Sequence, residues 1–162
     1  PSMCLLPIGL CFVLLSGALM DFIKDFKFIY QNDDYSCGRC CVYMIAERFG
    51  IDKSHRPVMS ELLNTDRNSG TYQKDIVATL NVYGLTTKVF SETYATLQAM
   101  KAQVKKNRIL ICYVDSDHWI VVRGFSKSRV YIADPASAQT YININTFKKR
   151  IVKGSFISIW QK

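Results

Sequence analysis

Histidine is scarce in this chain, and several patterns that would point to particular functions are missing. Among 162 residues there are only two histidines, His55 and His118. The sequence contains no repeat, no low-complexity segment and no stripe of basic residues with interleaved aromatics. The net charge of +8 therefore does not predict a nucleic-acid partner, although it is compatible with attraction to anionic lipid or to an acidic peptide. The length and an apolar content of 49% predict one folded domain with a real core.

The cysteines lack the spacing of a disulfide framework. Six are present at uneven intervals, and the first two lie in an apolar N-terminal stretch: Cys4, Cys11, Cys37, Cys40, Cys41 and Cys112. Cys40 and Cys41 are adjacent, so on a helix their side chains would point in different directions. We therefore expect mostly reduced thiols.

Charged residues are absent from residues 3–20, which read MCLLPIGLCFVLLSGALM. This run is just long enough for a marginal membrane helix, and residues 16–18 are small, as a signal cleavage site requires. No lysine or arginine precedes the run, so a helix packed on its own domain or on a second copy of the chain is the alternative. We expect residues 1–20 to be a signal, an anchor or a packed helix, and residues 21–162 to be the folded domain. A packed helix would permit a homodimer.

Helical patterns fill the first half of the chain, and strand patterns fill the second. Periodicity and capping residues predict helices at 37–49, 57–63, 72–83 and 92–104, with Ser54, Thr71 and Ser91 as caps, and a short strand at 85–90. Runs of β-branched and aromatic residues predict strands at 109–114, 118–125, 129–135, 141–145 and 154–160, with a helical turn at 146–151. This order predicts an α+β fold, in which an N-terminal helical part packs on a C-terminal antiparallel β-sheet around one core.

Three cysteines lie within five residues in the sequence NDDYSCGRCC, and they allow three interpretations. Cys37 and Cys40 have CxxC spacing at a helix start, as in thiol oxidoreductases, but no βαβ unit surrounds them. A zinc site would need two more ligands, and the remaining candidates do not pair with a neighbour. In the third interpretation, which we favour, Cys37 alone is a nucleophile. It lies in the first turn of the predicted helix, where unpaired N–H groups and the helix dipole stabilise a thiolate.

A cysteine nucleophile needs a base, and His118 is the candidate, because His55 lies in a basic, polar stretch typical of the surface. The strands on either side of residues 126–128 form a predicted hairpin, which places His118 opposite residue 136. Asp134 is then on the diagonal of the same face, within side-chain reach. It precedes a proline and is held extended, so it can accept a hydrogen bond from the imidazole and set the tautomer.

Attack on a carbonyl also requires donors for the oxyanion. The backbone N–H of Cys37 can be one donor. Gln31 lies six residues earlier, and its side-chain amide can come back across the acidic turn as the second donor. The four groups together predict nucleophilic chemistry that needs no metal and no organic cofactor.

These residues resemble the papain-like double-glycine peptidases, the bacteriocin-processing domains usually fused to the N-terminus of peptide-exporting ABC transporters. The resemblance covers about residues 28–160 and is carried by Gln31, Cys37-Gly38, the sequence DHW with His118, the sequence DP with Asp134, a CGxxCxxM helix pattern and residues 69–71. It implies a papain-like fold, with Cys37 as nucleophile, His118 as general base and acid, Asp134 as orienting residue and Gln31 as oxyanion donor. Cys40 departs from the family, which commonly has a small, alanine-like residue there.

The resemblance implies a cysteine endopeptidase that cuts a leader peptide after Gly-Gly, with a peptide or protein substrate as partner. The apolar segment at residues 3–20 precedes the domain where the family usually starts at once, and it predicts association with a membrane or transporter. We therefore expect a membrane-associated or exported bacterial protein. Two alternatives remain open. One is a non-catalytic module of the same fold that binds or tethers peptides, and the other is a thiol oxidoreductase using Cys37 and Cys40.

Overall fold

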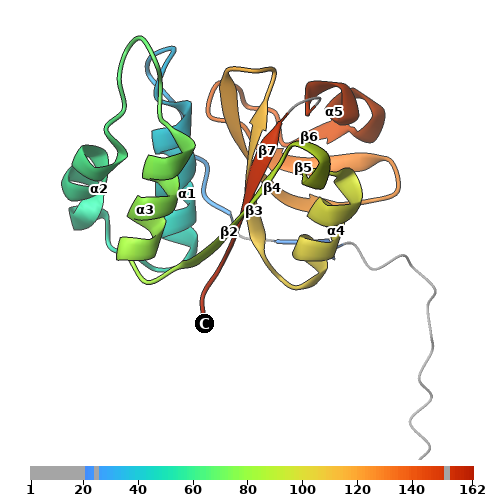
Figure 1. Ribbon diagram of the computed structural model, residues 1–162, viewed down its shortest axis with the longest axis horizontal. Coiled ribbons are helices and arrows are strands. Elements are labelled where there is room, and N and C mark those ends of the chain that lie inside the picture. Colours follow the sequence, from blue (N-terminus) through green and yellow to red (C-terminus); the bar gives the residue numbers. More distant parts are fainter. Residues whose placement is uncertain (1–20, 24–25, 152–153) are drawn as a thin grey trace, which may run out of the picture.

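The computed structural model describes residues 21–23, 26–151 and 154–162, which form one sheet with helices beside it (Figure 1). The helices are α1 (Cys37–Arg48), α2 (Arg56–Leu63), α3 (Gln73–Val82), α4 (Leu97–Lys105) and α5 (Ile144–Arg150), with 3₁₀ turns at Lys53–His55 and Glu92–Tyr94. The strands are β1 (Asp21–Phe22), β2 (Thr86–Ser91), β3 (Ile109–Val114), β4 (His118–Phe125), β5 (Arg129–Ala133), β6 (Tyr141–Asn143) and β7 (Ser155–Trp160).

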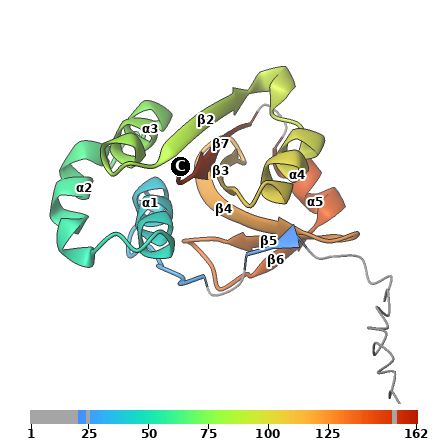
Figure 2. The ribbon, with the colours of Figure 1, turned by 90° about the horizontal axis from the view of Figure 1, so that it is seen from below.

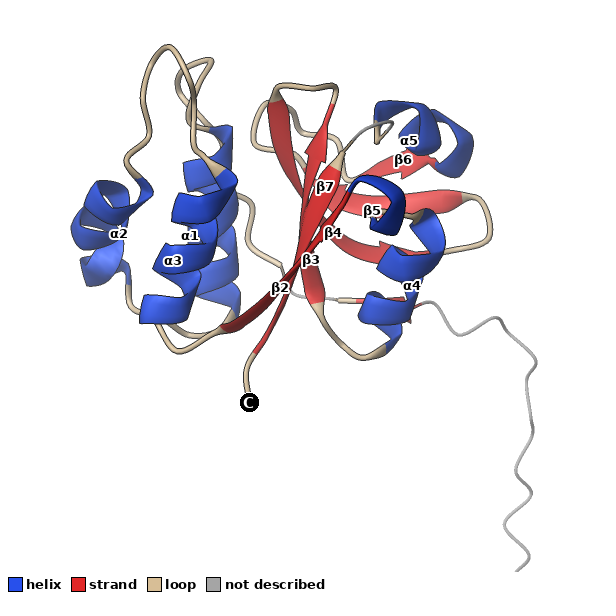
Figure 3. Cartoon of the chain, in the orientation of Figure 1, coloured by secondary structure: helices blue, strands red, loops and turns tan. Residues whose placement is uncertain are grey.

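The strands pair antiparallel in the order β2-β7-β3-β4-β5-β6 (Figure 3). The short strand β1, which the sequence did not predict, pairs with Gly124 and Phe125 at the end of β4. β3 pairs with β4 only as far as Val122. Beyond that residue, β1 takes the place of β3 along the same edge of β4. The predicted α+β class with an antiparallel sheet is confirmed.

Helices cover both faces of the sheet, with α1, α2 and α3 on one face and α4 and α5 on the other (Figure 2). Successive side chains of β3 point to opposite faces, so Ile109 and Ile111 pack with the first group, whereas Leu110 and Cys112 pack with the second. The first three helices lie against the sheet as predicted. The sheet nevertheless divides the interior into two halves, in place of the single core that we expected.

Several element ends differ from the prediction because side chains have other partners. Thr71 does not cap α3, whose N-cap is Tyr72. The predicted helix at 92–104 is in fact a 3₁₀ turn followed by α4. Thr96 caps α4, because its hydroxyl accepts a hydrogen bond from the N–H of Ala99 at 3.1 Å. Ser54 does not cap α2 either; its N–H donates to Asp52 in the preceding 3₁₀ turn.

The two strands that flank Asp134 in the sequence are shorter than expected. β5 ends at Ala133, two residues before Pro135, which has no N–H for a ladder. β6 ends at Asn143, whose side chain accepts from the N–H of Asn145 at 2.9 Å and so caps α5. The predicted helical turn at 146–151 is therefore the end of a longer helix.

Helices in the described ranges fall short of the length and apolar character that a membrane span requires. Residues 1–20, for which we expected a signal, an anchor or a packed helix, lie outside the described residues. The boundary between that segment and a domain at 21–162 stays a prediction, as does a homodimer through the segment.

Candidate active site

Cys37 is the first residue of α1, and a hydrogen-bonded turn leads into it. The carboxylate of Asp33 accepts from the backbone N–H groups of Tyr35, at 3.0 Å, and Ser36, at 2.7 Å. Its other oxygen lies 3.5 Å from the guanidinium of Arg39. These contacts fix the chain direction where the helix begins. The first N–H groups of a helix have no partner within it, so the thiol lies where backbone donors and the helix dipole favour an anion.

Close packing holds this end of α1 against two neighbouring segments. A β-carbon on Gly38 would lie 2.7 Å from the β-carbon of Thr71 and 3.0 Å from Cδ1 of Trp119. The thiol of Cys41, one turn further on, donates to the carbonyl of Trp119 at 3.4 Å. Glycine therefore allows the helix to approach β4 closely, and this approach brings Cys37 beside the start of that strand.

His118 begins β4 and is hydrogen-bonded to Asp134, which follows β5. Nε2 of His118 and Oδ1 of Asp134 are 2.7 Å apart. The same carboxylate oxygen accepts from the N–H of Ala136 at 2.9 Å, which fixes its orientation. Because Asp134 occupies Nε2, Nδ1 is the ring nitrogen left for Cys37, whose thiol lies near enough to the imidazole to raise the pKa of His118.

A β-bulge in the β4–β5 hairpin makes this alignment possible. Next to the turn, Phe125 pairs with Val130 and Gly124 with Tyr131, one residue out of step with the predicted register. After the irregularity between Val122 and Gly124, Val122 pairs with Ile132, which is the predicted register. The extra residue therefore returns His118 and Asp134 to the same face, as simple counting had placed them.

The charges of the site favour a protonated imidazole. Burial alone would lower the pKa of His118, but its hydrogen bonds to Asp134 and Cys37 outweigh burial and raise the pKa to about 9. Burial likewise opposes ionisation of Asp134, yet the hydrogen bonds from His118 and from the Ala136 N–H hold its pKa below the ordinary value. An imidazolium beside a carboxylate and a thiol is the arrangement that supports a thiolate nucleophile.

Gln31 lies next to the loop that carries Asp134. Its backbone N–H donates to the carbonyl of Pro135 at 3.0 Å. Its side-chain Nε2 donates to the carbonyl of Asp33 at 2.6 Å, and its Oε1 is buried without a partner among the described residues. The amide group has a second N–H, and that hydrogen is the donor that an oxyanion could use. The role of Gln31 stays a prediction.

The remaining described cysteines are buried, as expected for small core residues. Burial raises the pKa of the thiols of Cys40, Cys41 and Cys112, and the effect on Cys41 is large. All four described cysteines, including Cys37, are free thiols. Across the described ranges, histidine, cysteine and acidic side chains do not gather in threes in a way that could hold a metal ion.

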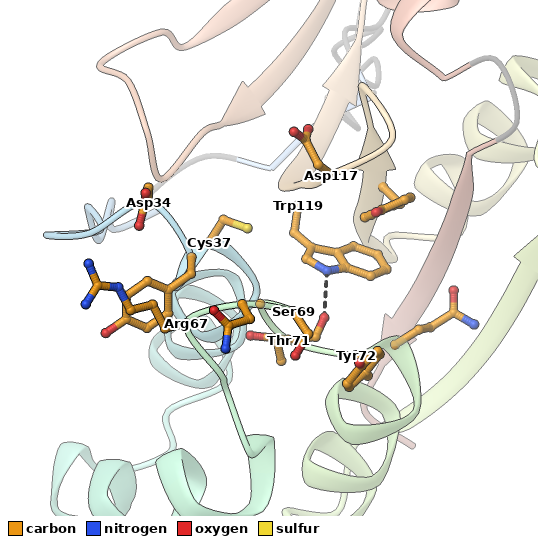
Figure 4. A pocket seen from close by; sticks show the side chains of 13 residues that line it. Asp34, Cys37, Arg67, Ser69, Thr71, Tyr72, Asp117 and Trp119 are labelled. Atoms are coloured by element: carbon orange, nitrogen blue, oxygen red, sulfur yellow. Dashed lines mark hydrogen bonds between the residues drawn. The ribbon is translucent and has the colours of Figure 1, made fainter.

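A cavity of about 320 Å³ opens beside Cys37 (Figure 4). Cys37 lies on one wall, Asp117 and Trp119 lie on the opposite wall, and the segment at 67–73 lines most of the rest. The indole N–H of Trp119 donates to the carbonyl of Thr71 at 3.0 Å and so ties that loop to β4. A peptide in this cavity would have its carbonyl carbon within reach of the thiol.

The sequence alone did not identify the cavity walls. Tyr113 packs on Trp119, with ring centroids 4.7 Å apart, and neither had been assigned to the site. Trp119 directly follows His118, and residues 69–71 carried part of the family resemblance. Those two signals were the only ones in the sequence that pointed to these walls.

Solved structures with this fold include peptidase domains of transporters. The peptidase domain of Streptococcus ComA, a bifunctional ABC transporter involved in a quorum-sensing pathway, gives a TM-score of 0.67 at 19% identity, covering 85% of this chain and 99% of that one. A double-glycine-motif protease from an AMS/PCAT transporter, in complex with the leader peptide, gives 0.66 at 19% identity, covering 82% and 91%. A C39-like peptidase from Bacillus anthracis gives 0.70 at 12% identity, covering 90% and 99%. The predicted papain-like peptidase fold is confirmed.

Sequence relatives agree with the fold. The lactococcin-G-processing and transport ATP-binding protein LagD of Lactococcus lactis subsp. lactis is 28% identical over 123 residues, which are 76% of this chain and 17% of LagD. An uncharacterized protein of Methanothermobacter marburgensis is 25% identical over 132 residues, covering 81% of this chain and 87% of that protein. The model of the peptidase C39 family matches residues 25–161, nearly all of the described chain. The chain therefore belongs to the peptidase C39 family.

Proposed function

We propose that the protein is a cysteine endopeptidase that cuts a leader peptide after a Gly-Gly motif. The observation that carries the proposal is the hydrogen-bonded pair of His118 and Asp134 next to Cys37, which lines a cavity. Family membership supports peptidase chemistry, and the double-glycine-motif protease and LagD support a leader peptide as substrate.

The mechanism follows from the positions of the four groups. The Cys37 thiolate attacks the scissile carbonyl, and the resulting oxyanion is held by the Cys37 N–H and the side-chain amide of Gln31. Protonated His118 then gives its proton to the leaving amine, and a thioester to Cys37 remains. His118 next takes a proton from the water that hydrolyses the thioester, which releases the acid product and restores the Cys37 thiolate and the protonated His118. Throughout, Asp134 holds the ring by Nε2 and stabilises its charge.

The substrate side of the proposal rests on the cavity. Cys37 is only 4% exposed, and Trp119 and the tied segment at 67–73 line the cavity with it. Residues without side chains next to the scissile bond would let a peptide backbone approach such a recessed thiol, whereas bulky side chains would meet these walls. A leader segment before the glycines would dock as an amphipathic helix on an apolar surface. Association with a transporter or a membrane through residues 3–20 belongs to the same proposal.

A cleavage assay with two matched peptides tests this function. One peptide carries a leader ending in Gly-Gly, and the second carries Val-Val at those positions. We expect one cut, after the second glycine, and at least about a 100-fold loss of kcat/KM for the second peptide, because buried clashes and lost alignment each cost an order of magnitude or more. Mass spectrometry of the products locates the cut.

Two outcomes of that assay would contradict the proposal. Equal cleavage of both peptides would contradict the Gly-Gly specificity. Binding of the Gly-Gly peptide by fluorescence anisotropy, with no cleavage by the wild-type protein and unchanged affinity in Cys37→Ala, would support the non-catalytic peptide-binding module instead.

A further inference from the structure

The turn between β3 and β4 carries two consecutive residues with left-handed backbone. Asp115 has a φ of 57° and Ser116 a φ of 72°, and neither is a glycine. Such conformations are unfavourable for residues with a β-carbon, although aspartate tolerates them better than most, and they persist only where surrounding contacts hold them. His118 directly follows this turn as the first residue of β4, so the conformation of the turn sets the position of its backbone and hence of the imidazole.

Arg150, the last residue of α5, holds this turn from the other side of the sheet. Its Nε and Nη2 lie 2.7 Å and 2.6 Å from Oδ2 of Asp115. In return, the backbone N–H of Asp115 donates to the carbonyl of Arg150 at 3.0 Å. The two residues are therefore joined both through their side chains and through their backbones. An isolated ion pair at the surface has only the first of these contacts and contributes little to stability.

Two neighbouring contacts bring the end of α5 and the turn together. The hydroxyl of Tyr113 donates to the carbonyl of Ser116 and closes the turn over the end of β3. Gly154, just before β7, approaches the carbonyl of Tyr113 so closely that a β-carbon there would lie 2.5 Å from it. The charge of Arg150 is also the smallest of the effects on the pKa of Asp134, after burial, the hydrogen bonds from His118 and Ala136 and the charge of His118.

We propose that Arg150 is a positioning residue, which clamps Asp115, keeps the β3–β4 turn left-handed and thereby holds the His118 ring between Asp134 and Cys37. The proposal rests on the proposed function only for its kinetic readout. The position of the ring can be measured without any substrate.

The pKa of His118 separates positioning from a simple charge effect. Removing a positive charge near His118 makes its protonated form easier to maintain, so a charge effect alone raises this pKa or leaves it unchanged. Loss of positioning lengthens the hydrogen bonds to Asp134 and Cys37, which are the contacts that raise the pKa. Positioning therefore predicts a fall.

The experiment compares four variants by kcat, KM and NMR titration of His118. Arg150→Ala removes the clamp, and Lys149→Ala removes the same charge from the exposed neighbour in the same turn. Asp115→Asn removes the clamp while keeping Arg150 and a residue that tolerates the left-handed region. Arg150→Ala combined with Ser116→Gly makes the turn favourable without the clamp, because glycine adopts positive φ freely and the backbone carbonyl that Tyr113 contacts is kept.

We expect Arg150→Ala and Asp115→Asn to lower kcat about tenfold or more with KM within about twofold, since small displacements of a catalytic group have effects of this size. Arg150→Ala should also lower the pKa of His118, whereas Asp115→Asn is judged by kcat, because the loss of a carboxylate lowers that pKa by charge alone. Lys149→Ala should do neither, and Ser116→Gly should restore most of the loss in Arg150→Ala. The proposal is overturned if both clamp variants match Lys149→Ala in kcat, if the pKa of His118 does not fall in Arg150→Ala, or if Ser116→Gly restores nothing. Were the wild-type protein to cleave no peptide, the proposed function would fail, whereas the titration and its rescue would still decide the positioning role.

Discussion

Replacing Cys37 by alanine is expected to lower kcat/KM by at least about 10⁴-fold, because no other described thiol faces His118 and the nucleophile cannot be substituted by water at this site. The fold should survive, since the change removes one sulfur at the cavity edge and leaves the packing of Gly38 on Thr71 and Trp119 intact. Cleavage assays and thermal unfolding of the variant measure the two effects.

Cys40→Ala is the matched control for this prediction. Cys40 is buried on the same helix three residues later, and its thiol pKa is raised by burial, so we assign it no chemical step. Its replacement should leave kcat/KM within about threefold, as expected for a small volume change in a core. If Cys40→Ala were as damaging as Cys37→Ala, the CxxC oxidoreductase would become the better account and the peptidase proposal would be wrong.

Replacing Asp134 by asparagine is expected to lower the pKa of His118 well below its value of about 9. Burial remains in the variant and disfavours the charged ring, whereas the negative charge that stabilised it is lost. The alkaline limit of kcat, which reports the loss of the general acid, should move to lower pH, and kcat should fall by about 10² to 10⁴. NMR titration of the imidazole measures the pKa directly, and a His55→Gln variant assigns the only other histidine signal.

The same pKa predicts how stability depends on pH. His118 has a folded-state pKa raised from 6.5 to about 9, so its contribution to the free energy of unfolding is fully present below about pH 6.5 and is lost as the pH rises through 9. The contribution of Asp134, whose pKa is lowered, is present above pH 3.8 and is lost as the pH falls through its folded-state pKa. Asp134→Asn should therefore remove most of the decline in stability between pH 6.5 and 9. An unchanged titration of His118 in this variant would contradict the pairing.

The elements that carry Cys37, His118 and Asp134 were predictable because each depends on a local signal, whereas the approach of Cys37 to His118 was expected from the need for a base and from the family resemblance. A helix start locates the thiol, and counting along one hairpin places the histidine and the acid on one face. The count gave the right partners although the residues next to the turn are out of step, because a bulge between Val122 and Gly124 restores the register. Bulges have no reliable sequence signal, so that agreement depended on a feature that could not be foreseen.

Features that depend on tertiary packing were not predictable. The apolar run ILICYV is typical of a strand buried on both faces, but the amphipathic patterns of α4 and α5 do not say which face each helix covers. The clamp between Arg150 and Asp115 joins residues 35 positions apart, and nothing in either local sequence marks it. The hydrogen bond from the Gln31 amide to the carbonyl of Asp33 was also missed, although the two residues are two positions apart, because it depends on the path of the turn.

The rate at which each cysteine reacts with iodoacetamide near neutral pH tests the central pairing of Cys37 and His118 most directly. A chain with Cys4 and Cys11 replaced by serine confines the reaction to the described thiols, and peptide mapping after short exposures gives the four rates. We expect Cys37 to be alkylated first, although it is no more exposed than Cys40, because it alone has an imidazolium beside it and lines the cavity by which the reagent enters. His118→Ala removes that imidazolium and should slow the reaction at least about tenfold. Equal rates for all four thiols, or a Cys37 rate that is unchanged by His118→Ala, would contradict the pairing.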